Sequence, residues 1–173
     1  MSIARLTLVL GGARSGKSRH AETLLMRAPR PWVYVATAEP LDEEMQARIA
    51  DHRARRGQGW ETIEAPRDLP AALAHAGASP VLVDCLTLWL TNLMLSGADI
   101  PAAEAELDAA LDARDAPTVL VANEVGLGIV PDNALARRFG DEAGRLNQRM
   151  AGRAECVLLM VAGLPVSVRS PSA

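Results

Sequence analysis

The sequence contains few aromatic residues, few cysteines and almost no lysine. Its 173 residues include three Trp, one Tyr and one Phe, and the formal net charge is -3. A nucleic-acid groove needs a basic face or rings on which bases stack, so this composition argues against a nucleic-acid partner. The two cysteines, Cys85 and Cys156, each lie in an apolar run. We therefore expect buried thiols in a reducing cytoplasm, not a disulfide framework or a metal site.

Long hydrophobic runs are also missing. The first apolar run covers only residues 6–10 and leads directly into a glycine-rich segment, which is not the pattern of a secretory signal. The apolar stretch 83–95 is too short to cross a bilayer. It is interrupted by polar residues, which are Asp84, Thr87, Thr91 and Asn92. We predict no membrane insertion, a cytoplasmic location and a single domain spanning residues 1–173, with enough apolar residues for one core.

The single lysine, Lys17, falls within a complete phosphate-binding motif. Residues 11–18 read Gly-Gly-Ala-Arg-Ser-Gly-Lys-Ser and match the pattern G-x-x-x-x-G-K-S/T. An apolar run at 6–10 predicts a strand before the motif, and apolar spacing predicts a helix over 17–26 after it. The alternative is a chance match in a glycine-rich turn, which the strand, loop and helix context makes rare. The residues predicted to bind nucleotide phosphates are Gly11, Gly12, Ala13, Arg14, Ser15, Gly16, Lys17 and Ser18.

The chemistry of nucleotide binding explains these residue types. Glycines let successive backbone N–H groups turn toward phosphate oxygens at the positive end of a helix. Lys17 is expected to reach the β and γ phosphates, and the Ser18 hydroxyl to bind Mg²⁺. Asp84 ends an apolar strand, where an acid can meet the same metal ion. We predict Ser18 and Asp84 as Mg²⁺ ligands. The alternative is that Asp84 caps the following helix.

Strand-like and helix-like segments alternate along the chain. The strand-like runs are continuously apolar, which is typical of parallel strands covered on both faces. Predicted strands cover residues 6–10, 32–36, 80–84, 118–122 and 155–161, with a short segment at 60–64, and predicted helices cover 17–26, 42–56, 85–95, 102–114 and 132–153. We therefore predict an α/β fold of the P-loop NTPase (RecA-like) type, with a mostly parallel sheet and helices on both faces.

A histidine flanked by arginines is the candidate nucleophile. On the predicted helix 42–56, Arg48, His52 and Arg55 are spaced i, i+4 and i+7 and share one face. Neighbouring guanidiniums disfavour the imidazolium form, which leaves a neutral nitrogen able to attack a nucleotide α-phosphate. The alternative is a solvated helix face on which His52 has no chemical role.

The scarcity of lysine bears on covalent catalysis as well. A transferase that holds its nucleotide on a lysine would have to use Lys17, which the phosphates already occupy, so a covalent route needs another nucleophile. Two other histidines compete with His52. His20 follows the phosphate loop on its helix and is expected to pack there. His75 has no charged neighbours and is expected at the surface or at a helix end.

Several ordered motifs resemble one family. They are the phosphate loop with its continuation at 11–22, Tyr-Val-Ala-Thr at 34–37, Asp-Glu-Glu-Met at 42–45, Ala-Arg-Ile at 47–49 followed by His52, and Asn-Glu-Val-Gly-Leu-Gly-Ile-Val-Pro at 123–131. Arg137, Gly144-Arg145 and Asn147-Gln148 extend the match almost to the C-terminus. On these residues the chain resembles the bifunctional adenosylcobinamide kinase and adenosylcobinamide-phosphate guanylyltransferase family of cobalamin assembly.

The resemblance implies two reactions at one nucleotide site. In the first, a nucleoside triphosphate, ATP or GTP, phosphorylates the aminopropanol hydroxyl of adenosylcobinamide. In the second, GTP guanylylates a histidine with loss of pyrophosphate, and adenosylcobinamide phosphate takes the GMP to give adenosylcobinamide-GDP. The family's histidine maps onto His52, which Asp51 precedes. The resemblance also implies a homotrimer.

Further nucleotide contacts follow from the resemblance alone. They are Ala36, Thr37, Ala38, Arg53, Ala54, Arg55, Arg56, Glu64 and Asp84. Glu124, after another strand, either helps the acceptor hydroxyl lose its proton or holds the loop that follows it. Two other functions stay open, a P-loop small-molecule kinase without a covalent intermediate and a GTP-binding switch or assembly ATPase. Against the GTP-binding switch, the chain has no Asn-Lys-x-Asp motif, which would recognise guanine.

Overall fold

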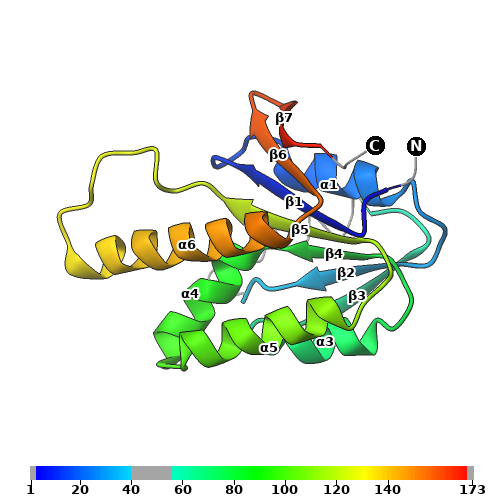
Figure 1. Cartoon of the computed structure of the whole chain (residues 1–173), viewed down its shortest axis with the longest axis horizontal. Coiled ribbons are helices and arrows are strands. Elements are labelled where there is room, and N and C mark those ends of the chain that lie inside the picture. The colour runs from blue at the N-terminus through cyan, green and yellow to red at the C-terminus, as the bar shows by residue number, and fades with distance from the viewer. Residues whose placement is uncertain (1–2, 40–55, 171–173) are drawn as a thin grey trace.

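The computed structural model describes residues 3–39 and 56–170. In this part of the chain seven strands form one sheet in the order β3-β2-β4-β5-β1-β6-β7 (Figure 1). Strands β1 to β6 pair in parallel, and β7 runs antiparallel to β6 at the edge. The strands are β1 (Leu6–Gly11), β2 (Trp32–Ala36), β3 (Trp60–Glu64), β4 (Val81–Asp84), β5 (Thr118–Asn123), β6 (Cys156–Val161) and β7 (Leu164–Arg169). The helices are α1 (Lys17–Leu25), α3 (Leu69–His75), α4 (Leu86–Ser96), α5 (Ile100–Asp112) and α6 (Ala134–Arg153).

Helices cover both faces of the sheet, as predicted. Helices α3, α4, α5 and α6 pack on one face, and α1 packs on the other (Figure 1). The side chains of β1 divide accordingly, because Leu6 and Leu8 join the core under the four helices and Val9 joins the core under α1. A strand that contributes to two cores has to be apolar along its whole length, which explains the continuous hydrophobic runs.

The predicted fold is confirmed, and two elements were missed. Predicted and observed boundaries differ by at most two residues, and the segment 60–64 forms a strand. The sequence did not predict α3, which begins where the Asp68 side chain accepts a hydrogen bond from the Ala71 amide at 3.1 Å. It did not predict β7 either, which follows a turn at Ala162 and Gly163 with positive φ at both residues. The predicted helix 42–56 lies outside the described residues, apart from Arg56.

The structure bears on the predictions about the cysteines and about membrane insertion. Both cysteines are free thiols, but only Cys85 is buried, and Cys156 is half-buried. Burial, together with the negative charge of the nearby Asp84, raises the pKa of the Cys85 thiol to about 11, so the group stays protonated near neutral pH. None of the helices in the described ranges has the length and apolar character needed to cross a bilayer.

A buried arginine joins α3 and the loop after it to the start of β5, at the amino end of the sheet. Arg114 is 5% exposed and donates hydrogen bonds to the carbonyl oxygens of Leu73, Gly77 and Ser79 at 2.7 to 2.9 Å. Its Nε also donates to Thr118 Oγ1 at 3.2 Å. Burial lowers the pKa of the guanidinium, yet the planar group donates to three carbonyl oxygens at once.

Replacing Arg114 with Ala should therefore destabilise the fold. We expect the free energy of unfolding in urea to fall by about 3 kcal/mol, because the three carbonyls lose their donor. Arg114→Lys should recover only part of this loss, since an ammonium cannot reproduce the planar geometry. The exposed Arg138→Ala is the matched control and should change stability by less than about 0.5 kcal/mol. Equal stability of the Arg114 and Arg138 variants would contradict this assignment.

Candidate functional site

The phosphate loop between β1 and α1 takes a conformation that requires glycine. Gly11 has φ of 155°, and a Cβ there would lie 2.7 Å from Ser15 Oγ and 2.8 Å from the Met160 carbonyl oxygen. Gly16 has φ of 90° in the left-handed region and begins α1. Since a side chain at either position would clash or strain the backbone, the geometry explains why the motif has glycine at both positions.

Lys17 and Ser15 are two polar side chains within the phosphate loop and the start of α1. The Lys17 side chain is 7% exposed and folds back over the loop, where Nζ donates to the Gly12 carbonyl at 2.6 Å. Ser15 Oγ is buried and, among the described residues, has no hydrogen-bond partner. An ammonium over the loop and an unsatisfied buried hydroxyl are groups that an oxygen-rich anion can use.

Neighbouring strands hold the loop in place. The Gly163 amide, in the turn between β6 and β7, donates to the Ser15 carbonyl at 3.1 Å. The Glu124 amide, after β5, donates to the Gly11 carbonyl at 3.0 Å. The turn before β7 therefore supports the phosphate loop, a role that sequence reasoning missed because it did not predict β7.

Asp84 lies at the carboxyl end of β4, as predicted. Its Oδ2 accepts a hydrogen bond from the Tyr34 hydroxyl at 3.0 Å. Burial, and then the negative charge of Asp84, raise the pKa of Tyr34, so the phenol stays protonated and keeps donating. The residue that caps α4 is Cys85, without a side-chain hydrogen bond. The alternative interpretation of Asp84 as the helix cap is therefore wrong.

Arg56 lies next to Tyr34 and contacts strand β3. Its guanidinium carbon lies 3.5 Å from the centroid of the Tyr34 ring, a cation–π contact, and Nη2 donates to Thr62 Oγ1 at 3.4 Å. Within the described part of the chain, Nη1 is buried without a hydrogen-bond partner. The structure thus brings Arg56, Tyr34 and Asp84 together, and Tyr34 is a site residue that sequence reasoning missed. The sequence feature that could have drawn attention to Tyr34 is that it is the only tyrosine of the chain.

The segment after β2 is fixed to the end of β4. Thr37 is fully buried, its Oγ1 donates to the Cys85 carbonyl at 2.8 Å, and the same Oγ1 accepts from the Cys85 amide at 2.7 Å. The Asn92 side chain donates to the Thr37 carbonyl at 2.8 Å. The Thr37 hydroxyl is therefore used within the fold, while Ala36 and Ala38 beside it are half-buried.

The remaining predicted residues lie at different places. Glu64 ends β3 and lines a pocket of about 580 Å³ together with Glu39, Arg67 and His75. His52, Arg53, Ala54 and Arg55 lie outside the described residues.

Two histidines and Glu124 match their expected settings. His20 is half-buried on α1, where burial and then Arg27 lower its pKa. His75 is exposed at the end of α3. Glu124 Oε1 accepts from the Gly126 amide at 2.8 Å, which supports its role in holding the loop that follows.

The oxygen donors of the site suit a magnesium ion bound with a nucleotide. Ser18 lies in the first turn of α1 and Asp84 at the end of β4, and both are half-buried. Across residues 3–39 and 56–170, no group of three or more His, Cys, Asp or Glu could hold a metal. Magnesium in nucleotide sites takes most of its ligands from water and phosphate, so a hydroxyl and a carboxylate fit this requirement.

The fold and the phosphate loop define the class of the protein, a P-loop NTPase. Among solved structures it resembles the type III secretion ATPase EscN from enteropathogenic E. coli, with a TM-score of 0.59 and 12% identity over 97% of this chain and 48% of that chain. A prototypical type III secretion ATPase gives a TM-score of 0.56 and 14% identity over 96% of this chain. The chain covers 58% of that ATPase, and identity this low shows the fold alone.

The chain belongs to the family described as cobinamide kinase / cobinamide phosphate guanyltransferase, whose sequence profile matches residues 7–168. It is 50% identical over 168 residues to the bifunctional adenosylcobalamin biosynthesis protein CobP of Pseudomonas aeruginosa, covering 94% of this chain and 96% of the relative. It is 45% identical over 182 residues to CobU of Salmonella typhimurium, covering 95% and 99%. The resemblance drawn from the motifs is confirmed, and the protein is an enzyme of this kinase and guanylyltransferase family.

The contact between Tyr34 and Asp84 generates a prediction for metal binding. Tyr34→Phe removes the hydroxyl and keeps the ring under Arg56. We expect the Asp84 carboxylate to lose its fixed orientation, so that half-maximal binding of Mn²⁺ with GTP needs about five- to tenfold more metal, as the loss of one hydrogen bond implies. Electron paramagnetic resonance of Mn²⁺ measures this without relying on turnover.

A double variant separates this effect from general loosening of the site. If Tyr34 acts through Asp84, Tyr34→Phe combined with Asp84→Asn should bind the metal no more weakly than Asp84→Asn alone. Additive losses, or an unchanged metal affinity in Tyr34→Phe, would show that the hydroxyl does not position the carboxylate.

Proposed function

We propose that this enzyme phosphorylates adenosylcobinamide and then links it to GMP through a guanylylated His52. The observation that carries the proposal is a complete phosphate loop on the same sheet edge as the Arg56, Tyr34 and Asp84 cluster, in a chain of this family. The carboxyl ends of parallel strands are where such folds bind their ligands.

In the first reaction the aminopropanol hydroxyl oxygen attacks the γ-phosphorus of ATP or GTP. A new P–O bond forms, the bond to the bridging oxygen breaks, the nucleoside diphosphate leaves, and the hydroxyl proton passes to solvent. Loop amides between Gly12 and Lys17 hold the phosphates, and the Lys17 ammonium offsets their negative charge. Ser18 and Asp84 would hold a magnesium ion, which would further neutralise the phosphate charge when bound.

In the second reaction a neutral imidazole nitrogen of His52 attacks the α-phosphorus of GTP. A P–N bond forms and pyrophosphate leaves. A phosphate oxygen of adenosylcobinamide phosphate then attacks the same phosphorus, the P–N bond breaks, and adenosylcobinamide-GDP is released. Because the chain has no lysine beyond Lys17, a histidine is the available nitrogen nucleophile.

Arg56, four residues after His52 in the sequence, supports His52 as that nucleophile. Its guanidinium is stacked on the Tyr34 ring, and the Tyr34 hydroxyl donates to Asp84. Arg53, Ala54 and Arg55, the other predicted nucleotide contacts of this segment, stand between His52 and Arg56 in the sequence.

Substituting His52 by Ala should abolish covalent labelling and leave phosphorylation intact. When the protein is incubated with GTP labelled at the α-phosphate, the wild type should carry an acid-labile, alkali-stable label, as expected of a phosphoramidate. The His52→Ala variant should carry none but should still convert adenosylcobinamide to its phosphate, because the γ-phosphate transfer does not use the imidazole. Peptide mapping of the labelled wild type locates the modified residue.

Two control variants show whether a loss of label is specific to His52. The exposed His75→Ala should be labelled like the wild type, and Lys17→Ala should lose both reactions because the phosphates lose their cation. Label that persists in His52→Ala would refute the assignment. An unlabelled wild type that phosphorylates adenosylcobinamide would instead identify a kinase without a covalent intermediate.

We also infer that the chain forms a homo-oligomer, as the family resemblance implies. Supporting this, β7 is an exposed edge strand, and Leu164, Val166 and Val168 alternate along it. Apolar edge strands favour pairing with another chain. Sedimentation velocity should give a species larger than the 18.4 kDa monomer, and a Val166→Lys variant should shift it toward the monomer. A wild type that sediments as a monomer at micromolar concentration would refute the inference.

A further inference from the structure

An exposed apolar surface lies on the edge of the sheet where the phosphate loop is. The loop between β5 and α6, together with the facing ends of α4 and α6, presents five large apolar side chains that are 60% to 97% exposed. We call this surface the apolar platform; its residues are Leu95, Leu127, Ile129, Val130 and Leu135. Apolar groups at such exposure rarely cluster on a monomer without a binding role.

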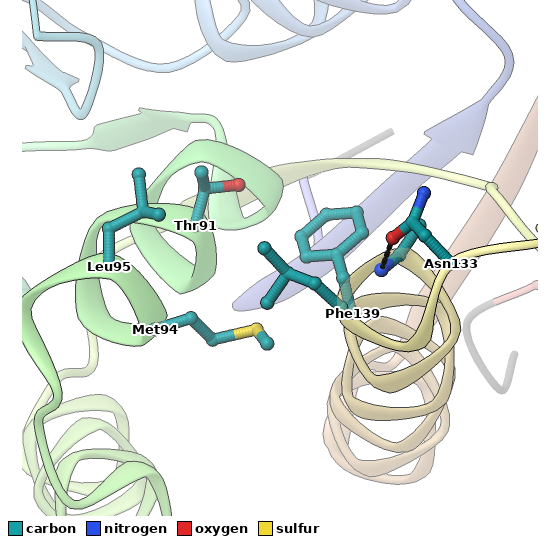
Figure 2. Close-up of a pocket in the computed structure, with 7 residues that line it drawn as sticks. Thr91, Met94, Leu95, Asn133 and Phe139 are labelled. Carbon is teal, nitrogen blue, oxygen red and sulfur yellow. Dashed lines mark hydrogen bonds between the residues drawn. The ribbon is translucent and has the colours of Figure 1, made fainter.

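A pocket of about 330 Å³ opens in the platform between α4 and α6 (Figure 2). The residues that line it are Thr91, Met94, Leu95, Asn133, Leu135, Ala136 and Phe139. Figure 2 shows the Met94 and Phe139 side chains facing each other across the gap between the two helices. Its size is that of a small-molecule site, and its apolar lining with polar groups at Thr91 and Asn133 suits an apolar body bearing polar substituents.

The loop that carries part of the platform begins beside the phosphate loop. Asn123, the last residue of β5, pairs in register with Gly11, and the Glu124 amide donates to the Gly11 carbonyl at 3.0 Å. The loop that carries Leu127 and Ile129 therefore starts at the phosphate loop, and Figure 1 shows it leaving that end of the sheet before it turns into α6.

Helix α4 gives the distance from the pocket to the metal-binding edge. The helix begins at Leu86, two residues after Asp84, and its residues Thr91, Met94 and Leu95 line the pocket. At 1.5 Å of rise per residue they lie about 8 to 14 Å along the helix from its start. A ligand anchored in the pocket can thus reach the phosphates only through an arm several bonds long.

From these observations we propose that the apolar platform and its pocket bind the corrin macrocycle of the substrate. This rests on the proposed function. Cobinamide joins an apolar macrocycle with peripheral amides to a flexible aminopropanol arm, which matches an apolar pocket with polar groups beside it and a phosphate site one arm away. A triphosphate does not suit the pocket, because none of the seven residues that line it carries a positive charge to offset the lost hydration of the phosphates.

The test separates corrinoid binding from nucleotide chemistry. Leu127→Gln with Leu135→Gln changes two exposed side chains, so the fold should be retained. We expect the dissociation constant of adenosylcobinamide, measured by calorimetry, and its KM in the phosphorylation reaction to rise at least about tenfold, because two apolar contacts are lost. The kcat at saturating corrinoid and the labelling of the protein by GTP should stay within about twofold of the wild type.

A matched control and the opposing outcomes complete the experiment. Met26→Gln replaces another exposed apolar side chain, at the far end of α1 from the phosphate loop, and should leave corrinoid affinity unchanged. Unchanged affinity in the double variant, or an equal loss in Met26→Gln, would overturn the proposal. A change in sedimentation of the double variant would also overturn it, by assigning the platform to contacts between copies. Failure of the proposed function differs from all of these, because the wild type itself would then fail to phosphorylate adenosylcobinamide.

Discussion

The close approach of three backbone segments at Gly11 is the constraint on which the site depends. Gly11 pairs with Asn123 on one side and with Met160 on the other. A Cβ would lie under 3 Å from both Ser15 Oγ and the Met160 carbonyl. The phosphate loop can therefore form only if the strands on both sides keep this spacing. Sheet hydrogen bonds, together with the Glu124 and Gly163 amides that donate to the loop, fix its position relative to β5 and β6.

The other half of the functional edge is held by side chains. Thr37 ties the segment after β2 to Cys85, and the Tyr34 hydroxyl holds the Asp84 carboxylate. These contacts join residues about fifty positions apart in sequence, since β2 and β4 are neighbours in the sheet. The phosphate loop and the predicted metal ligand Asp84 thus belong to one frame whose spacing is set by strand order, and electrostatic preorganisation of this kind costs no rearrangement during reaction.

Local patterns could be predicted from the sequence, and contacts between distant segments could not. The phosphate loop is a contiguous motif. Strands such as β1 are apolar on both faces because their side chains pack into a core on each side of the sheet. Strand β7 has polar and apolar residues in alternation with Pro165 among them, which did not read as part of a parallel sheet. The contact of Tyr34 with Asp84 depends on strand order, which periodicity does not encode. His52 stays a prediction, because its segment lies outside the described residues.

Both flanks of the segment that carries His52 are tied to the sheet edge. Before it, Glu39 forms an ion pair with Arg67 at 2.9 Å, and after it Arg56 is stacked on Tyr34. Glu39 follows β2, Arg67 follows β3, and Arg56 contacts Tyr34 of β2 and Thr62 of β3. The two strands farthest from β7 in the sheet therefore fix the residues on either side of the segment on which the proposed nucleophile lies. A substitution at Arg67 or Tyr34 would release one of these attachment points without touching the phosphate loop.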